Sequence, residues 1–328
     1  MKKQFNKKNV ITIVAVMLIY AVIFMLVQTN VLSRHYQSLL VPIGINIILA
    51  VSLNLTVGFL GELTLGHAGF MSVGAYAGCM FTVYMDLPVA VEFPLAILIG
   101  GLVAAVFGMI IGVPVLRLKG DYLAIVTLAF GEIIRSLITN FSVTGGAGGL
   151  KGIDKTTNYT IVFVAIIITV LVIANLVKSR QGRAICSIRD NIIASESVGI
   201  NVVYYKLLAF VVAAFFAGVA GVLYGHNLGI LKPDTFDFNK SIEILVIVVL
   251  GGMGSIRGSI ISATIITLLP EVLRGLADYR MLIYAVVLIV MMILNASPGF
   301  EAFKKNLFSK VKGKNLNRKE NGDGTIRN

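Results

Sequence analysis

The chain contains a series of apolar runs, and most of them approach the roughly 20 helical residues needed to cross the hydrocarbon core of a membrane. Charged residues make up only 13% of the sequence and hydrophobic residues 57%, whereas soluble domains carry about 25% charged residues. We therefore exclude a water-soluble fold and predict an all-α, polytopic bundle of transmembrane helices. The clearest runs are 10–27, 39–57, 93–115, 160–177, 207–224, 242–253, 259–269 and 281–294.

The net charge of +12 is concentrated in three basic clusters beside apolar runs. They lie within 1–9, 178–189 and 304–319. Basic clusters next to membrane helices mark cytoplasmic segments, so this charge indicates orientation and not nucleic-acid binding. We expect a basic cytoplasmic amino terminus at 1–9, a transmembrane domain at 10–300 with a cytoplasmic loop at 178–206, and a disordered basic cytoplasmic tail at 301–328.

This orientation constrains the number of crossings. Both termini and the basic loop are cytoplasmic if the chain crosses six times before the loop and four times after it. The count requires two less apolar helices, 67–85 and 121–139, and predicts ten crossings, although eight also fit. The second of these helices contains Glu132 and Arg135, which are costly in lipid unless they face the bundle interior or pair with each other.

Two glycine-rich segments, 58–69 and 249–258, interrupt the apolar pattern. The first has four glycines and three polar residues in twelve positions, so it is not a plain spanning helix. Broken segments of this kind line pathways and form hinges in transporters, while glycines also serve close helix packing. His67 is either a proton carrier or a hydrogen-bonded structural residue. The residues assigned to a pathway or hinge in this segment are Gly58, Gly61, Gly66, His67 and Gly69.

The sequence carries no motif for catalysis or cofactor binding. It has no GxxxxGK[ST] loop to hold nucleotide phosphates. His35, His67 and His226 lack the HExxH spacing, and no paired cysteines accompany them. Cys79 and Cys186 indicate no disulfide framework. We therefore expect no catalytic residue, no metal, no cofactor in this chain and no enzymatic activity.

The predicted cytoplasmic loop is long enough for a helix pair. Ile185, Ile188, Ile192 and Ile193 recur there at spacings of three and four residues, which predicts an amphipathic helix with one apolar face. Such a helix can lie on lipid headgroups or dock into a groove of a cytosolic partner. Gly199 is expected to turn the chain back toward the membrane.

The sequence RDNIIASESVGIN at 189–201 resembles the coupling loop of ABC importer permeases of the branched-chain amino acid family, and specifically the longer, M-type permease subunit. The resemblance covers roughly 54–300, although Ser195 stands where alanine is more usual. The other motifs that carry it are 58–69, GDYLAIVTLAFGEIIR at 120–135, TGG at 144–146, SIE at 241–243, 249–258 and YRMLIY at 279–284.

The resemblance implies a permease subunit that forms half of a translocation pathway for leucine, isoleucine or valine in a bacterial inner (cytoplasmic) membrane. A second homologous permease would complete the pathway within the lipid bilayer. Two cytosolic ATP-binding subunits would bind ATP and Mg²⁺, and an extracytoplasmic binding protein would deliver the substrate.

Three sets of residues follow for this function. The apolar face of the loop is expected to enter a groove on the ATPase, with Arg189 and Glu196 fixing the register through charged contacts. The ATPase-coupling set is Ile185, Ile188, Arg189, Asp190, Ile192, Ala194, Glu196, Gly199, Ile200 and Asn201. Thr127, Glu132 and Glu243 join the glycine-rich segment as pathway residues. The expected docking set for the binding protein, on two outer loops, is Gly145, Gly146, Lys232, Asp234, Asp237 and Lys240.

Two other functions fit the sequence. A secondary transporter of amino acids driven by an ion gradient would use Glu62, His67 and Glu132 as proton-coupled groups and would need no ATPase. A permease of the same ABC family would instead carry urea or short-chain amides.

Overall fold

A computed structural model describes residues 34–272 except Asp86 and Lys119, together with the isolated residues Met25, Thr29, Ala285, Val286 and Ile289. The predicted terminal segments 1–9 and 301–328 lie outside the described residues, as do nearly all of the predicted helices 10–27 and 281–294. The chain divides into two compact units, Met1–Leu268 and Leu269–Asn328, and almost all described residues belong to the first.

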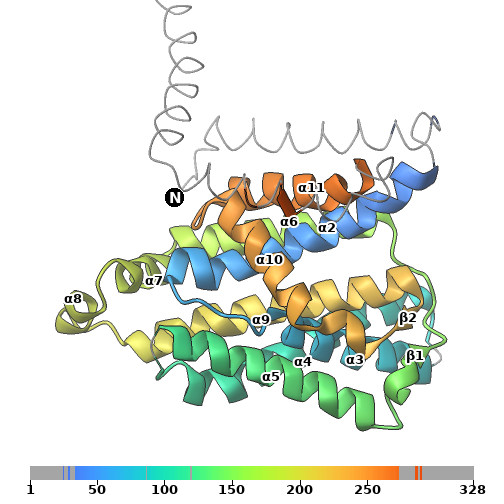
Figure 1. Cartoon of the computed structure of the whole chain (residues 1–328), viewed down its shortest axis with the longest axis horizontal. Coiled ribbons are helices and arrows are strands. Elements are labelled where there is room, and N and C mark those ends of the chain that lie inside the picture. Colours follow the sequence, from blue (N-terminus) through green and yellow to red (C-terminus); the bar gives the residue numbers. More distant parts are fainter. Residues whose placement is uncertain are drawn as a thin grey trace, which may run out of the picture. The chain divides into compact units, whose positions relative to one another are not determined.

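The described part of the first unit is built almost entirely from helices, as predicted (Figure 1). The first half contains α2 (Arg34–Asn54), the π-helical turn η1 (Leu55–Leu60), α3 (His67–Tyr84), α4 (Val89–Val115), α5 (Asp121–Asn140), η2 (Gly146–Gly148) and β1 (Leu150–Lys151). The second half contains α6 (Tyr159–Lys178), α7 (Arg180–Asp190), α8 (Ile192–Ser197), α9 (Val202–Leu228), β2 (Ile230–Leu231), η3 (Pro233–Phe236), α10 (Phe238–Gly251) and α11 (Ile256–Val272).

Several of these helices are suited to crossing a membrane. Among the described residues, five helices are long and apolar enough: Tyr36–Leu60, Val89–Val115, Asp121–Asn140, Tyr159–Lys178 and Val202–Leu228. The two less apolar helices, α3 and α5, form where they were predicted, while α10 and α11 are shorter, at 14 and 17 residues. The bundle therefore fits a multi-pass membrane protein, and the number of crossings stays a prediction.

Glycines allow the helices around α9 to approach closely. A Cβ atom on Gly74 of α3 would lie only 2.2 Å from the Cα of Gly218 on α9, and one on Gly221 would lie 2.1 Å from the carbonyl oxygen of Met71. α9 also packs against α2 and α4. Small residues are what permit such close contacts between membrane helices, so these glycines serve the packing of α3 against α9.

The predicted break in the first glycine-rich segment is present between α2 and α3. The chain leaves the helix at Gly61, whose φ of 81° lies in the left-handed region, and residues 61–66 are not helical. The break begins after the first glycine of the glycine-rich segment, because Gly58 lies inside the π-helical turn. Such turns are rare and frequently mark functional sites.

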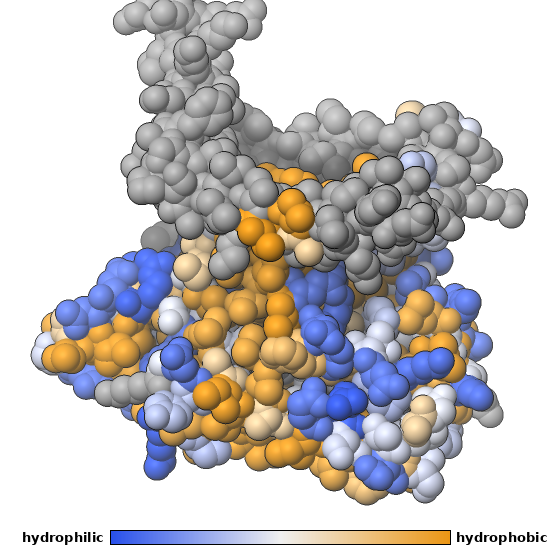
Figure 2. Space-filling view, viewed as in Figure 1, coloured by the Kyte–Doolittle hydropathy of each residue, from blue (hydrophilic) through white to orange (hydrophobic). Residues whose placement is uncertain are grey.

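The first unit has two distinct ends. In Figure 1, α7 and α8 lie at the left end and β1 and β2 at the right end. Figure 2 shows hydrophobic residues across the middle of the visible face and hydrophilic residues gathered toward both of these ends. This distribution matches helices whose middle parts lie in lipid and whose ends meet water.

Candidate functional site

The predicted coupling loop folds as two short helices, where the isoleucine spacing predicted one amphipathic helix. Asn191 separates them, because its extended backbone, with φ of −161° and ψ of 109°, ends α7. Its side-chain Oδ1 accepts a hydrogen bond from the Ala194 N–H at 3.0 Å and caps α8. The single apolar face predicted to continue through Ile192 and Ile193 is therefore interrupted.

The apolar face of α7 is buried within the chain itself. Ile185 and Ile188 are each only 1% exposed, and Ile192 packs against the same cluster. The other buried members come from the π-helical turn and from α9: Leu55, Phe59, Leu60, Val202 and Ala209. The prediction that this face enters a groove on an ATPase is wrong for these isoleucines, because they anchor α7 to the bundle.

A different apolar surface is exposed on α8 and the residue that follows it. Ile193 is 80% exposed and Val198 75%. This surface also includes the exposed residues Ala194, Glu196 and Ser197. We call these five residues the loop tip. The exposure of the two apolar residues was not predicted, although Asn191, a typical helix N-cap, was the signal that a new helix with a new orientation begins there.

Arg189 turns toward the bundle. Its Nη1 donates a hydrogen bond to the carbonyl oxygen of Gly58 at 3.1 Å, and its aliphatic stem packs on Gly61, where a Cβ atom would lie 2.6 Å from the arginine Cγ. The same guanidinium donates to Asp190 through Nε and Nη2 at 3.1 and 3.0 Å. The role predicted for Arg189, fixing the register against an ATPase, is therefore corrected: its contacts join α7 to the glycine-rich segment.

The turn after α8 forms as predicted. Gly199 has a φ of 85°, in the left-handed region, and the Ile200 N–H donates to the carbonyl oxygen of Ser195 at 3.0 Å. Asn201 then caps α9, because its Oδ1 accepts from the Tyr204 N–H at 3.1 Å. These predicted loop residues return the chain to the bundle.

A buried ion pair lies beside the break. Lys206 on α9 donates a hydrogen bond to Glu62 in the break, and the two side chains are 5% and 12% exposed. Glu62 was predicted only as a proton-coupled group of a secondary transporter, and no role was predicted for Lys206. The signal was a lone basic residue in an apolar stretch, since charged residues in membrane segments are paired or face the interior.

Three predicted pathway residues, Gly66, His67 and Thr127, lie together beside the break. Thr127 Oγ1 accepts a hydrogen bond from the Leu65 N–H at 3.0 Å, and a Cβ atom on Gly66 would lie 2.7 Å from the Thr127 carbonyl oxygen. His67 is buried, with its Nε2 2.8 Å from the hydroxyl of Ser52. This contact supports the structural interpretation of His67.

Gly69 serves helix packing one turn further along α3. A Cβ atom there would lie 2.8 Å from the Cα of Gly131 on α5. The two pathway glutamates each pair three residues away along their own helix. Glu132 contacts Arg135 at 2.7 Å, which confirms the predicted pair, and Glu243 contacts Lys240 at 3.0 Å.

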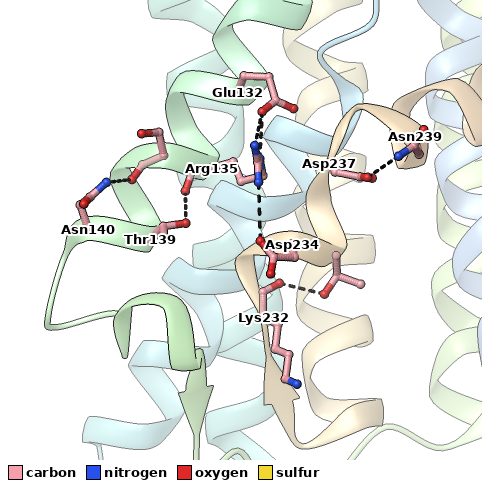
Figure 3. Close-up of polar contacts among 10 residues, drawn as sticks. Glu132, Arg135, Thr139, Asn140, Lys232, Asp234, Asp237 and Asn239 are labelled. Carbon is pink, nitrogen blue, oxygen red and sulfur yellow. Dashed lines mark hydrogen bonds and ion pairs between the residues drawn. The ribbon is translucent and has the colours of Figure 1, made fainter.

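The two predicted outer loops meet at the end opposite α8. β1 pairs with β2 in antiparallel register, with Leu150 opposite Leu231 and Lys151 opposite Ile230. Gly145 and Gly146 adopt left-handed φ values of 83° and 57° in the first loop. In the second loop, Asp234 lies 3.5 Å from Arg135 of α5, so one further charged side chain joins the Glu132–Arg135 pair (Figure 3).

The charged residues predicted to dock a binding protein differ in their exposure and in their contacts within the chain. Asp237 caps α10 by accepting from the Lys240 N–H at 3.0 Å, and the Lys240 ammonium donates to Asn46 at 3.2 Å as well as to Glu243. Asp237 and Lys240 therefore have structural contacts that the prediction did not include. Lys232 is exposed, and Asp234 is 82% exposed.

An apolar cavity of about 820 Å³ lies between α4, α6 and α9. Its lining includes Phe93, Ile97, Val164, Phe215 and Val219, and none of the predicted site residues. In the part of the chain that the structure describes, no three His, Cys, Asp or Glu side chains gather to hold a metal ion.

Comparison with protein families matches residues 35–295 to the family described as branched-chain amino acid transport system / permease component. The chain is 35% identical over 257 residues to the high-affinity branched-chain amino acid transport system permease protein LivM of Salmonella typhimurium (strain LT2), a match that covers 68% of this chain and 60% of LivM. The chain thus spans about 60% of the length of this curated relative.

Two further relatives are more distant. The high-affinity branched-chain amino acid transport system permease protein LivH of Salmonella typhimurium (strain LT2) is 31% identical over 112 residues, which is 34% of this chain and 36% of LivH. The ribose import permease protein RbsC of Haemophilus influenzae is 24% identical over 296 residues, covering 84% of this chain and 90% of RbsC. No solved structure matches the chain.

Proposed function

Because the chain belongs to the branched-chain amino acid transport system permease family, we propose that it is the membrane-spanning subunit of an ATP-binding cassette importer. In this proposal it forms half of the translocation pathway for leucine, isoleucine or valine. The observation that carries the proposal is the family match over 35–295, which includes the bundle, the break and the α7–α8 pair. Ribose import by the more distant RbsC shows a second substrate class among similar permeases, and the higher identity to LivM favours amino acids.

ATP and Mg²⁺ are bound by partner subunits in this proposal, since the sequence has no phosphate-binding loop. The docking surface for such a subunit is the loop tip. Its exposed apolar residues, Ile193 and Val198, stand on a helix pair anchored in the bundle, which suits insertion of a short helix into a groove. Basic residues of α7, Arg180 and Arg183, support a cytoplasmic location for this end in the proposal.

The opposite end then faces the outside of a bacterial inner membrane and meets an extracytoplasmic binding protein. Lys232 and Asp234 supply the exposed charges for that contact, since complementary charges steer association and set specificity. A second permease of the same family, which LivH exemplifies, completes the pathway.

Transport in proteoliposomes tests the proposal. The full chain is reconstituted with a second permease, the ATP-binding subunits and the binding protein of the proposed importer, and leucine uptake is measured. We expect uptake that requires ATP and the binding protein. Leucine uptake by the chain alone under a proton gradient would instead establish the secondary transporter, and competition by urea or acetamide but not by isoleucine would establish the amide importer.

Docking of the loop tip is tested by replacing both exposed apolar residues, as Ile193→Ser with Val198→Ser. Both side chains are largely exposed, so the fold should keep its stability, while binding of the ATP-binding subunits in detergent should weaken at least tenfold. The matched control is Tyr122→Ser, an exposed apolar residue outside the loop. Unchanged association in the double variant would remove the loop tip as the docking surface.

A further inference from the structure

The break is held by two side chains that lie on either side of the loop tip in the sequence. Arg189 precedes Ile193 by four residues, and Lys206 follows Val198 by eight. Arg189 bonds to Gly58 at the start of the glycine-rich segment, and Lys206 bonds to Glu62 within its non-helical part. The loop tip is therefore joined to the same short segment from both directions.

The Arg189 contact is closely fitted. The carbonyl oxygen of Gly58 lies near the end of the π-helical turn, where carbonyl groups lose their helical partners, and the guanidinium supplies a charged donor at 3.1 Å. Gly61 must lack a side chain here, because a Cβ atom would meet the arginine stem at 2.6 Å while its φ of 81° already disfavours other residues.

The second glycine-rich segment reaches the same point. A Cβ atom on Gly254 would lie 3.3 Å from Nη1 of Arg189 and 3.4 Å from the carbonyl oxygen of Gly58. The Gly254 N–H donates to Oδ1 of Asn54 at 2.8 Å. Arg189 thus lies where both glycine-rich segments of the sequence meet.

The Lys206 contact differs from a surface ion pair because both partners are buried. Glu62 cannot move away from Lys206 without leaving the ammonium group, whose side chain is only 5% exposed, without its anionic partner, which is strongly unfavourable. Between the two polar contacts, Ile185 and Ile188 pack against Leu55 and Phe59 of the π-helical turn. Packed cores of this kind shift between discrete arrangements and do not deform gradually.

We propose that Arg189 and Lys206 are positioning residues that couple the loop tip to residues 61–66. This inference rests on the proposed function: displacement of α8 by a nucleotide-binding partner reaches the break through the Arg189–Gly58 hydrogen bond and the Lys206–Glu62 ion pair. The break then changes its conformation between α2 and α3, where the pathway residues Gly66 and His67 lie.

The first test measures substrate molecules imported per ATP hydrolysed in the reconstituted complex. Arg189→Gln and Lys206→Met should lower this ratio by roughly tenfold or more, the factor expected for one charged hydrogen bond. ATP-subunit binding and ATP hydrolysis should stay within about twofold of the wild type. Arg183→Gln is the matched control, because Arg183 is an exposed arginine of the same helix whose contact is with Lys178.

The second test observes the break without transport. Leu63, an exposed residue of the break, is replaced by cysteine in a Cys186→Ala background, and the rate of maleimide labelling is measured in the full chain. Arg189→Gln should raise this rate severalfold even without partner subunits. In the wild-type complex, ATP should change the rate, and in the Arg189→Gln complex it should not.

The outcomes separate the inference from the function on which it rests. Absence of ATP-dependent uptake by the wild-type complex contradicts the proposed function, while the labelling of Leu63→Cys still reports the Arg189 contact. A normal import ratio in both Arg189→Gln and Lys206→Met overturns the inference, as does a loss of ATP-subunit binding that accounts for all lost transport. If Lys206→Met does not fold, Arg189→Gln decides, since its partly exposed side chain tolerates replacement.

Discussion

The two ends of the first unit contain ion pairs of similar chemistry in different surroundings. Near α7 and α8, Lys206 and Glu62 are 5% and 12% exposed. At the β1–β2 end, Arg135 and Glu132 are 36% and 35% exposed, and Asp234 beside them is 82% exposed. Exposed pairs contribute little because water screens them, whereas a buried pair binds its two segments together. The first end therefore has a buried ion pair that joins α9 to the break, and the second end has ion pairs that are accessible to water.

Replacing one partner of each pair should give the largest contrast. Lys206→Met leaves Glu62 buried without a cation and should lower the free energy of unfolding by about 3–5 kcal/mol. Arg135→Met should lower it by less than about 1 kcal/mol, because Glu132 remains accessible to water. Thermal or denaturant unfolding of the purified chain in detergent measures both, and equal losses would contradict the comparison.

The double variant Glu62→Leu with Lys206→Met serves as the control. Replacing both charges with apolar side chains of similar size is often nearly neutral. We therefore expect most of the stability lost in Lys206→Met to return, while the import ratio stays low because the contact is gone. If the double variant also restored the ratio, Lys206 would have only a structural role.

Glycine replacements should give a smaller difference in lost stability between the two ends. Gly61→Ala and Gly146→Ala both place a side chain at a positive φ, which costs about 1–2 kcal/mol. At Gly61 the new methyl group also meets Arg189, whereas at Gly146 its closest neighbour is a carbonyl oxygen at 3.4 Å. We expect Gly61→Ala to lower the free energy of unfolding by about 2–4 kcal/mol and Gly146→Ala to lower it by about 1–2 kcal/mol. The same unfolding assay measures both.

Helix caps at the two ends should have similar energies and different consequences. Asn191 caps α8 and Asp237 caps α10, and replacing either with alanine should cost about 1 kcal/mol. Since α8 has only six residues, Asn191→Ala should also increase amide exchange in the loop tip and weaken ATP-subunit binding. Asn191→Asp keeps the cap and should behave like the wild type; a loss of binding in that variant would indicate that Asn191 itself touches the partner.

The sequence was sufficient to predict most of the described helices and the position of the break. The prediction of ten crossings included α3 and α5 within one residue of their observed ends, because cytoplasmic termini and a cytoplasmic loop required two less apolar helices in addition to the apolar runs. The spacing of the isoleucines predicted one amphipathic helix in the loop, and the cap at Asn191, which starts α8, was not part of that prediction.

The orientation of α7 was not predictable in the same way. An amphipathic helix has the same pattern whether its apolar face meets lipid, a partner or its own bundle, so Ile185 and Ile188 were assigned to the wrong neighbour. Lys206 and Glu62 are 144 residues apart in the chain, and local spacing does not reveal long-range contacts of this kind. Those contacts determine which surface of the loop is exposed.

The smallest expected effect concerns the thiol of Cys186 on α7. Burial raises the pKa of this thiol above its usual range, the positive charge of Arg189 lowers it, and Asp190 raises it. Because the thiolate is the reactive form, maleimide labelling of Cys186 should require a higher pH than labelling of a free thiol. Arg189→Gln should raise the pKa further and slow labelling at pH 7 by less than about tenfold, while Asp190→Asn should accelerate it.

The pH profile of this reaction distinguishes charge from access. If Arg189 acts on Cys186 through its charge, Arg189→Gln moves the midpoint of the labelling rate to higher pH and leaves the maximal rate unchanged. Arg183→Gln, on the same helix, should leave the midpoint in place. A higher maximal rate in Arg189→Gln without a shifted midpoint would show that Arg189 instead limits access to Cys186 by holding α7 against its hydrophobic cluster. The α7–α8 end would then depend more on this one contact than the β1–β2 end depends on any of its exposed pairs.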